Sequence, residues 1–391
     1  MSQLFLLVVL WGILVNFKIT FWRESMLTVM RAPSRYVQGA NAILELEKHV
    51  SSIGTKFYVV ADEFVMNMTK EKIEQAFGGD TSKLVFEEFY GQSSMTEIRR
   101  IEELLKMSGC DAIIGIGGGR TFDTVKAVGH FSKVSVIIVP TIAATDAPCT
   151  ALSVIYNDEG EFSEYLFYPK NPDVVLVDST IIAKAPVRFL VAGMGDALGT
   201  YFEARTCLNT KSANLVAGAV SQAGFALSKL CYEILRDYGL KAKLAVENDA
   251  VTPAVEKVLE ACTYLSGVGA ENGGLATAHS IYNGFTILKQ CEKTMHGEIV
   301  AFGTLVQLIL EDQPMEEIEN VIDFCLTVGL PITLNQIGLT DYTSEELMRV
   351  AQAACKEGET IHNTQGGVTV TEVYNAIVTA NAMGEEYLQL A

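Results

Sequence analysis

A run of glycines at positions 115–119, with the sequence Gly-Ile-Gly-Gly-Gly, has the composition of a phosphate-binding turn. An apolar strand at 111–114 precedes it, and apolar residues at helical spacing follow it. Bare backbone N–H groups on such a strand-to-helix turn can approach a phosphate, and the helix start adds partial positive charge. The pattern predicts a pyrophosphate cradle, although it matches neither the Rossmann nor the Walker fingerprint and a tight structural turn would also use these glycines.

Three residues in the second half of the chain have the types of a metal-binding set. Asp196 lies in an apolar segment that we expect to start a helix, His279 lies within a helix, and His296 begins another. One carboxylate and two imidazoles leave an open coordination position, as a catalytic metal requires. Histidines that only pack in the core are the alternative for both imidazoles.

Two polar side chains follow predicted strands. Asp62 ends the strand 56–61, and Thr141 follows the strand 134–139. In open parallel sheets ligands bind beyond the carboxyl ends of the strands. A carboxylate at Asp62 can accept the ribose hydroxyls of a dinucleotide and would repel a 2′-phosphate, which favours NAD over NADP, unless Asp62 is only a solvated acid.

Alternating strands and helices must position these residues in the first half, whereas the second half shows helical periodicity alone. The pattern predicts an α/β N-terminal domain with a parallel, Rossmann-like sheet over 26–187 and an all-α C-terminal domain over 188–391. The expected strands are 56–61, 84–89, 111–114, 134–139, 152–156 and 174–177. The expected helices after residue 187 are 213–238, 253–267, 275–288, 297–310, 314–328, 344–354 and 371–390.

Composition narrows the class of partner. The 391 residues carry a formal net charge of −18, which argues against nucleic acid or an anionic membrane as a partner. Eight cysteines are scattered singly without a C-x-x-C pair, so free thiols in a reducing, cytoplasmic protein are expected.

Residues 1–25 differ in composition from the rest. The apolar run 4–15 is too short to span a membrane, and it lacks the flanks of a signal peptide. We expect an N-terminal extension outside the fold, with a membrane anchor as the second interpretation.

Five motifs together resemble the metal-dependent (iron-containing type) alcohol dehydrogenase superfamily, and within it the bacterial glycerol dehydrogenases. The motifs occupy 115–123, 140–149, 192–197, 273–279 and 296–303, in the family's order. The similarity extends from about Met26 to the C-terminus. It implies a dehydroquinate synthase-like fold and a homo-oligomer, for which the family allows an octamer.

The resemblance also assigns site residues. The family's metal ligands fall on Asp196, His279 and His296, and its substrate contact falls on Asp146, so that Asp146, Asp196 and His279 form the expected catalytic set. Asp146 could instead only cap the turn at 145–148. The NAD contacts fall on Asp62, Gly117, Gly118, Gly119, Arg120, Thr141, Thr150, Leu152 and Tyr156.

Four positions depart from the family pattern. Arg120 replaces a Lys, which alters the side-chain contact to phosphate; Thr150 replaces a Ser. Tyr282 replaces a His, and Thr200 stands where iron-dependent members place a further ligating His. Three ligands and an open site favour Zn²⁺, with Fe²⁺ as the second choice.

The resemblance therefore implies NAD- and zinc-dependent oxidation of a small polyol, glycerol or another vicinal diol, with glycerol giving dihydroxyacetone. A glycerol-1-phosphate dehydrogenase or a dehydroquinate synthase is the alternative within the superfamily. Both take acidic substrates and would need a Lys or Arg near the metal, but none lies within several residues of Asp196 or His279, and only Lys293 comes near His296. An inactive NAD- or metal-binding scaffold is the alternative from another class.

A protein that starts at Met26 tests the interpretation of residues 1–25. We expect it to be soluble and fully active, because the apolar run would otherwise form an exposed patch that soluble proteins rarely tolerate. Gel filtration and turnover of both forms provide the measurement. Misfolding or loss of activity after the truncation would show that residues 1–25 are part of the fold.

Overall fold

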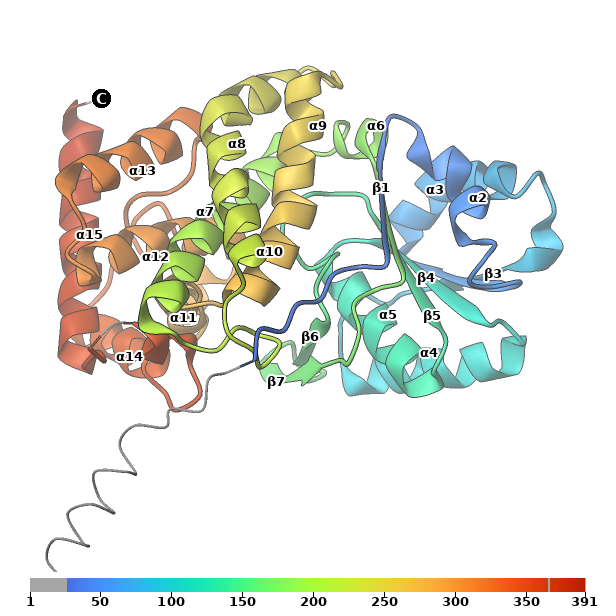
Figure 1. Cartoon of the computed structure of the whole chain (residues 1–391), viewed down its shortest axis with the longest axis horizontal. Helices are drawn as coiled ribbons and strands as arrows, with labels where there is room; N and C mark the ends of the chain where they lie inside the picture. The colour runs from blue at the N-terminus through green and yellow to red at the C-terminus, as the bar shows by residue number, and fades with distance from the viewer. Residues whose placement is uncertain (1–26, 365, 391) are drawn as a thin grey trace, which may run out of the picture.

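The parallel sheet and the helical part lie side by side in the protein (Figure 1). The structure is a computed structural model that describes residues 27–364 and 366–390. The extension predicted over 1–25 lies outside the described residues. Within those residues no helix is long and apolar enough to cross a membrane.

Six parallel strands form the main sheet in the order β1-β8-β5-β4-β2-β3, which confirms the predicted fold class. Side chains alternate between its two faces, so Tyr58 and Val60 of β2 pack in one core and Phe57 and Val59 in the other. The strands are β1 (Arg35–Gly39), β2 (Phe57–Ala61), β3 (Leu84–Glu88), β4 (Ala112–Gly117), β5 (Ser135–Pro140) and β8 (Val174–Asp178).

Helices cover both faces of this sheet. Val65 and Ile73 of α3 pack in the core that contains Phe57, whereas Ile98 and Ile101 of α4 pack in the opposite core. The helical elements of this part are η1 (Ala42–Glu45), α2 (Leu46–Val50), α3 (Glu63–Ala76), η2 (Thr81–Lys83), α4 (Met95–Ser108), α5 (Gly119–Ser132) and α6 (Ser179–Ile182).

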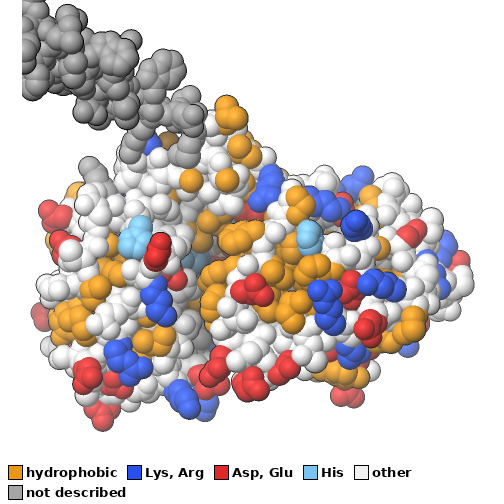
Figure 2. Space-filling view, turned by 90° about the horizontal axis from the view of Figure 1, so that it is seen from below, with side chains coloured by type: hydrophobic (Ala, Val, Ile, Leu, Met, Phe, Trp, Pro, Cys, Tyr) orange, Lys and Arg blue, Asp and Glu red, His pale blue; other side chains and the backbone are white. Residues whose placement is uncertain are grey.

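The strand predicted at 152–156 is β6 (Leu152–Tyr156), but it lies outside the main sheet. It pairs antiparallel with β7 (Phe162–Phe167), a strand that the sequence did not predict. All but one of the β7 residues are exposed, so no alternation of buried and exposed positions marks this segment as a strand. The face that carries this hairpin, at the bottom of Figure 1, gathers hydrophobic side chains across its middle in Figure 2.

The second half is helical, as predicted. Its elements are α7 (Val187–Thr210), α8 (Gln222–Val246), α9 (Pro253–Glu260), the π-helical turn η3 (Ala261–Leu265), α10 (Ser266–Gly273), α11 (Thr277–Phe285), η4 (Lys289–Cys291), α12 (His296–Leu310), α13 (Met315–Val328), α14 (Ser344–Ala354), η5 (Thr360–Asn363) and α15 (Val370–Leu390).

Two predictions about this half were wrong. Asp196 lies in the interior of α7 and not at a helix start, because the helix begins nine residues earlier at Val187. The helix expected from 213 begins only at Gln222, where the Ser221 side chain accepts from the Gly224 N–H and caps it. The preceding loop is held by Asn214, whose Oδ1 accepts from the Gly218 N–H at 2.8 Å.

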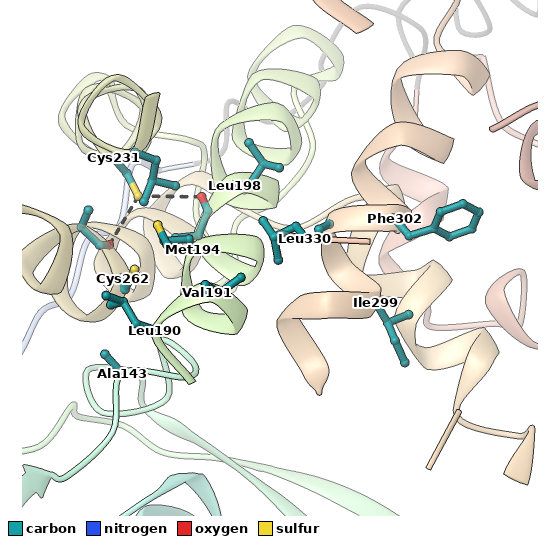
Figure 3. Packing of buried hydrophobic residues seen from close by; sticks show 14 of the residues in the cluster. Ala143, Leu190, Val191, Met194, Leu198, Cys231, Cys262, Ile299, Phe302 and Leu330 are labelled. Atoms are coloured by element: carbon teal, nitrogen blue, oxygen red, sulfur yellow. Dashed lines mark hydrogen bonds between the residues drawn. The ribbon is translucent and has the colours of Figure 1, made fainter. Parts of the chain in front are cut away.

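Glycines let α7 and α12 touch through their backbones. A Cβ on Gly195 would lie 2.2 Å from the carbonyl oxygen of Gly297, and a Cβ on Gly297 would lie 1.8 Å from that of Ala192. Figure 3 shows the apolar side chains that line the two helices around this crossing, with Leu330 between them. The contact fixes the residues next to these glycines, Asp196 and His296, against each other.

Gly297→Ala tests this crossing. The added methyl group has no room against the Ala192 carbonyl, so we expect a loss of about 3 kcal/mol in the free energy of unfolding. Urea unfolding provides the measurement. Ala226→Ser, on an exposed position of α8, is the control and should change stability little. Equal stability of Gly297→Ala and the parent would show that the helices can separate without penalty.

Candidate metal and dinucleotide sites

Asp196, His279 and His296 lie together, although they come from α7, α11 and α12. Their candidate ligand atoms all lie within 4.8 Å of one another. Asp196 Oδ1 is 3.3 Å from His279 Nε2 and 3.0 Å from His296 Nε2. Three donor atoms therefore converge on one point, and the two histidines are not isolated core residues.

Glu203 orients His279 and was missed by the sequence analysis. Its Oε2 is 2.6 Å from His279 Nδ1, and its Oε1 accepts from the backbone N–H of His279 at 3.0 Å and of Ala276 at 2.9 Å. A proton held on Nδ1 leaves Nε2 free as a ligand atom. Glu203 follows Asp196 by seven residues, two helical turns, and this spacing was the available signal.

The charges of the cluster fit a bound cation. Asp196 and Glu203 are fully buried, and the ion pairs of residues 27–364 and 366–390 bring no Lys or Arg to either of them or to Asp146. Although burial alone would raise the pKa of the Asp196 carboxyl, His296 and His279 hold that pKa below its usual value. Burial opposes protonation of His279, but Glu203 and Asp196 raise its pKa well above the usual value. Buried carboxylates in such surplus are unfavourable unless positive charge compensates them, and a divalent metal at the three ligand atoms would do so.

Asp146 approaches the same cluster from the loop between β5 and β6. Its backbone N–H donates to Asp196 Oδ2 at 3.1 Å, and its Oδ2 accepts from the Ser266 hydroxyl at 3.1 Å. Burial and the neighbouring Asp196 carboxylate raise the pKa of Asp146 to about 7. Asp146 also starts a turn, but through its backbone carbonyl, which accepts from the Cys149 N–H at 3.2 Å, whereas its side chain bonds to Ser266.

A cavity of about 470 Å³ lies beyond the carboxyl ends of the parallel strands. Asp62, Gly118, Gly119, Arg120 and Thr141 all line it, so the structure brings five of the predicted dinucleotide contacts together. Gly118 caps α5 and Gly119 begins it, which leaves the free N–H groups of that helix start at the cavity. The position and the donors fit a dinucleotide.

Asp62 and Gly117 also have local structural roles. Asp62 Oδ1 accepts from the Val65 N–H at 2.9 Å and so caps α3. The cap uses only this oxygen and does not involve Oδ2. Gly117 ends β4, has a φ of 149°, and is not among the residues that line the cavity. Its carbonyl accepts from the Thr141 N–H at 2.9 Å and so holds Thr141 beside the glycines.

Thr150, Leu152 and Tyr156 lie on the segment that leads into and forms β6, outside the lining of this cavity. The Arg120 guanidinium lies 5.8 Å from the Tyr156 ring centre, which links the hairpin to the glycine turn. The buried Lys126, which the sequence analysis missed, pairs with Asp123 at 3.0 Å.

Lys126 also anchors the loop that contains Asp146. Its ammonium donates to the carbonyls of Ala147, at 3.1 Å, and Leu152. The loop that reaches the metal cluster is thereby tied to α5, the helix that begins at the glycine turn.

Comparison with known proteins identifies the family. The model of the iron-containing alcohol dehydrogenases matches residues 33–179. A glycerol dehydrogenase of Citrobacter freundii is 49% identical over 363 residues, which cover 93% of this chain and 100% of that protein. The chain belongs to the iron-containing alcohol dehydrogenase family.

Other members agree with this assignment. A glycerol dehydrogenase of Thermotoga maritima is 50% identical over 92% of this chain and 98% of that protein. The crystal structure of a probable glycerol dehydrogenase from Sinorhizobium meliloti has a TM-score of 0.86 and 41% identity, covering 92% of this chain and 99% of that one. The predicted class, an alcohol dehydrogenase, is therefore confirmed.

The structure shows what two of the residues that depart from the family pattern, Tyr282 and Thr200, contact. The Tyr282 ring packs edge-on against His296, with 4.1 Å between ring centres, so it forms part of the wall around this imidazole. Thr200 is fully buried and its hydroxyl lies 2.9 Å from that of Ser266, which leads toward Asp146. The Thr200 hydroxyl therefore points into a hydrogen-bond network that includes Ser266 and Asp146.

Glu203→Gln tests the orientation of His279. Gln keeps the size of the side chain but loses the charge that holds the proton on Nδ1, so we expect zinc affinity to fall about 10- to 100-fold. Competition with a chromogenic chelator measures it. Glu316→Gln, at an exposed position of α13, is the matched control. Parent-like affinity in Glu203→Gln would remove Glu203 from the site.

Proposed function

We propose that this protein is a zinc- and NAD-dependent dehydrogenase that oxidises glycerol, or a related vicinal diol, to the hydroxyketone, dihydroxyacetone in the case of glycerol. The observation that carries the proposal is the cluster Asp196–His279–His296 with Asp146 hydrogen-bonded to it. Glycerol dehydrogenases at 49% and 50% identity over nearly the whole chain support the same substrate.

The two groups would supply different parts of the chemistry. Zinc, held by Asp196, His279 and His296, supplies a Lewis acid that lowers the pKa of a substrate hydroxyl when bound. NAD, held by the cavity that Asp62, Gly118 and Arg120 line, supplies the acceptor for a hydride when bound.

The protein's own residues fix the geometry of these parts. Glu203 holds the proton of His279 on Nδ1, and Tyr282 fixes the ring of His296 from the side. Asp146 stands beside Asp196 with one oxygen bonded to Ser266, and we assign its other oxygen to a second substrate hydroxyl. With both hydroxyls of a diol held in this way, the carbon that is oxidised would be held in one orientation in the site.

The charge of the site favours a neutral substrate. The hydrogen bonds and ion pairs within the part of the chain that the structure describes place carboxylates, and no Lys or Arg, on the metal cluster and Asp146. A divalent cation would offset these carboxylates, but a phosphorylated or carboxylated substrate would still find no Lys or Arg there to pair with its charge. This disfavours a glycerol-1-phosphate dehydrogenase or a dehydroquinate synthase.

Turnover of glycerol with NAD tests the proposal directly. We expect activity that exhaustive chelation abolishes and that added zinc restores, because the hydroxyl would keep its ordinary pKa without the metal. His279→Ala should lose both bound zinc and activity while its far-ultraviolet circular dichroism stays close to that of the parent. Turnover that survives chelation, or a zinc-free parent that remains active, would contradict the metal assignment.

Asp62→Gly tests cofactor choice. The parent should prefer NAD because the Asp62 carboxylate accepts ribose hydroxyls and repels a 2′-phosphate. The variant should narrow the ratio of kcat/KM for NAD over NADP by about tenfold. Glu63→Gly removes the neighbouring acid and is the control. A parent that uses both cofactors with equal efficiency would be inconsistent with the assignment.

A further inference from the structure

Helix α7 holds Asp146 at two points. Asp196 Oδ2 accepts the backbone N–H of Asp146 directly, at 3.1 Å. One helical turn later, Thr200 reaches the carboxylate through Ser266: Thr200 Oγ1 is 2.9 Å from Ser266 Oγ, and Ser266 Oγ is 3.1 Å from Asp146 Oδ2. The backbone and the side chain of Asp146 are therefore both fixed from one face of one helix.

The direction of this hydrogen-bond chain follows from its donors. A hydroxyl has one proton, and the Ser266 hydroxyl donates its proton to Asp146 Oδ2. Thr200 must therefore donate to Ser266. Both hydroxyls are fully buried, so water does not replace a lost bond, and an unpaired hydroxyl there is unfavourable.

The π-helical turn η3 places Ser266 between Thr200 and Asp146 in this series of hydrogen bonds. It lies between α9 and α10 without a break, and its wider turn rotates the residues that follow it relative to α9. Gly267, the next residue, approaches so closely that a Cβ on it would lie 2.8 Å from the Asp146 carbonyl oxygen. The close approach of Gly267 brings the neighbouring Ser266 hydroxyl within 3.1 Å of Asp146 Oδ2.

The start of the turn is tied to α7 as well. The Cys231 thiol lies 3.4 Å from the Ala261 carbonyl oxygen and 3.7 Å from that of Ala197, the residue after Asp196 (Figure 3). The π-helical turn is thus held in register with the helix that carries the metal ligand. The position of η3 relative to Asp146 is therefore fixed by α7 as well as by the loop between β5 and β6 that carries Asp146.

We propose that Thr200 and Ser266 are positioning residues that aim the Asp146 carboxylate at the second hydroxyl of a polyol substrate. Ser266 occupies Oδ2, and the hydrogen bonds of the described residues leave Oδ1 for the substrate. The inference rests on the proposed polyol oxidation. It gives the pair a role in substrate affinity that is separate from metal binding.

A pair of variants at Thr200 separates positioning from packing. Thr200→Val keeps the shape but removes the hydroxyl, whereas Thr200→Ser keeps the hydroxyl and removes a methyl group. We expect Thr200→Val and Ser266→Ala to lower kcat/KM for glycerol about tenfold, mainly through KM, and Thr200→Ser to stay close to the parent. Bound zinc, measured by atomic absorption, should be equal in all of them.

Thr304→Val is the matched control. Thr304 is also fully buried, and among the described residues its hydroxyl bonds only to the Val300 carbonyl of its own helix, at 2.9 Å. The inference is overturned if Thr200→Ser loses more than Thr200→Val, if all three site variants keep the parental KM, or if zinc is lost in parallel with activity. A parent that oxidises no polyol would instead overturn the proposed function. If Ser266→Ala misfolds, the comparison of Thr200→Val with Thr200→Ser still tests the positioning role.

Discussion

The backbone contact between α7 and α12 is the constraint on which the metal cluster depends. Neither Gly195 nor Gly297 has room for a Cβ. Gly195 directly precedes Asp196, and Gly297 directly follows His296. Asp196 Oδ1 and His296 Nε2 lie 3.0 Å apart at this crossing, where the two helices are closer than ordinary side chains would allow. Close packing at two residues without functional groups therefore determines where the chemistry is placed.

The charges that this packing buries determine what the cluster can bind. The crossing buries Asp196 and Glu203 with two imidazoles and brings Asp146 beside them. Burial of carboxylates in excess of cations is unfavourable unless a metal or protons compensate. The carboxylates that favour a divalent cation also leave the cluster, within the described residues, without a Lys or Arg that could pair with an anionic ligand.

The loop between β5 and β6 connects the two halves of the site. It starts at Thr141, which Gly117 holds beside the dinucleotide cavity, and continues to Asp146, which Asp196 holds beside the metal cluster. Lys126 ties the next part of this loop to α5. A short segment with anchors at both ends thus sets the relative position of the two candidate sites.

The sequence by itself determined the parallel sheet and the helical second half, because strand hydrophobicity and helical periodicity are local properties. Residue type alone made Asp196, His279 and His296 only candidates for a metal set, and the family resemblance was needed to select them over histidines that pack in the core. It did not reveal that β6 leaves the sheet to pair with β7, since the exposed β7 carries no period-two pattern. Nor did it reveal the bonds of Glu203 and Ser266, which depend on partners 76 and 120 residues away. Only the tertiary structure decided these contacts, because helix crossings and the phase shift of a π-helical turn arise from packing between distant segments.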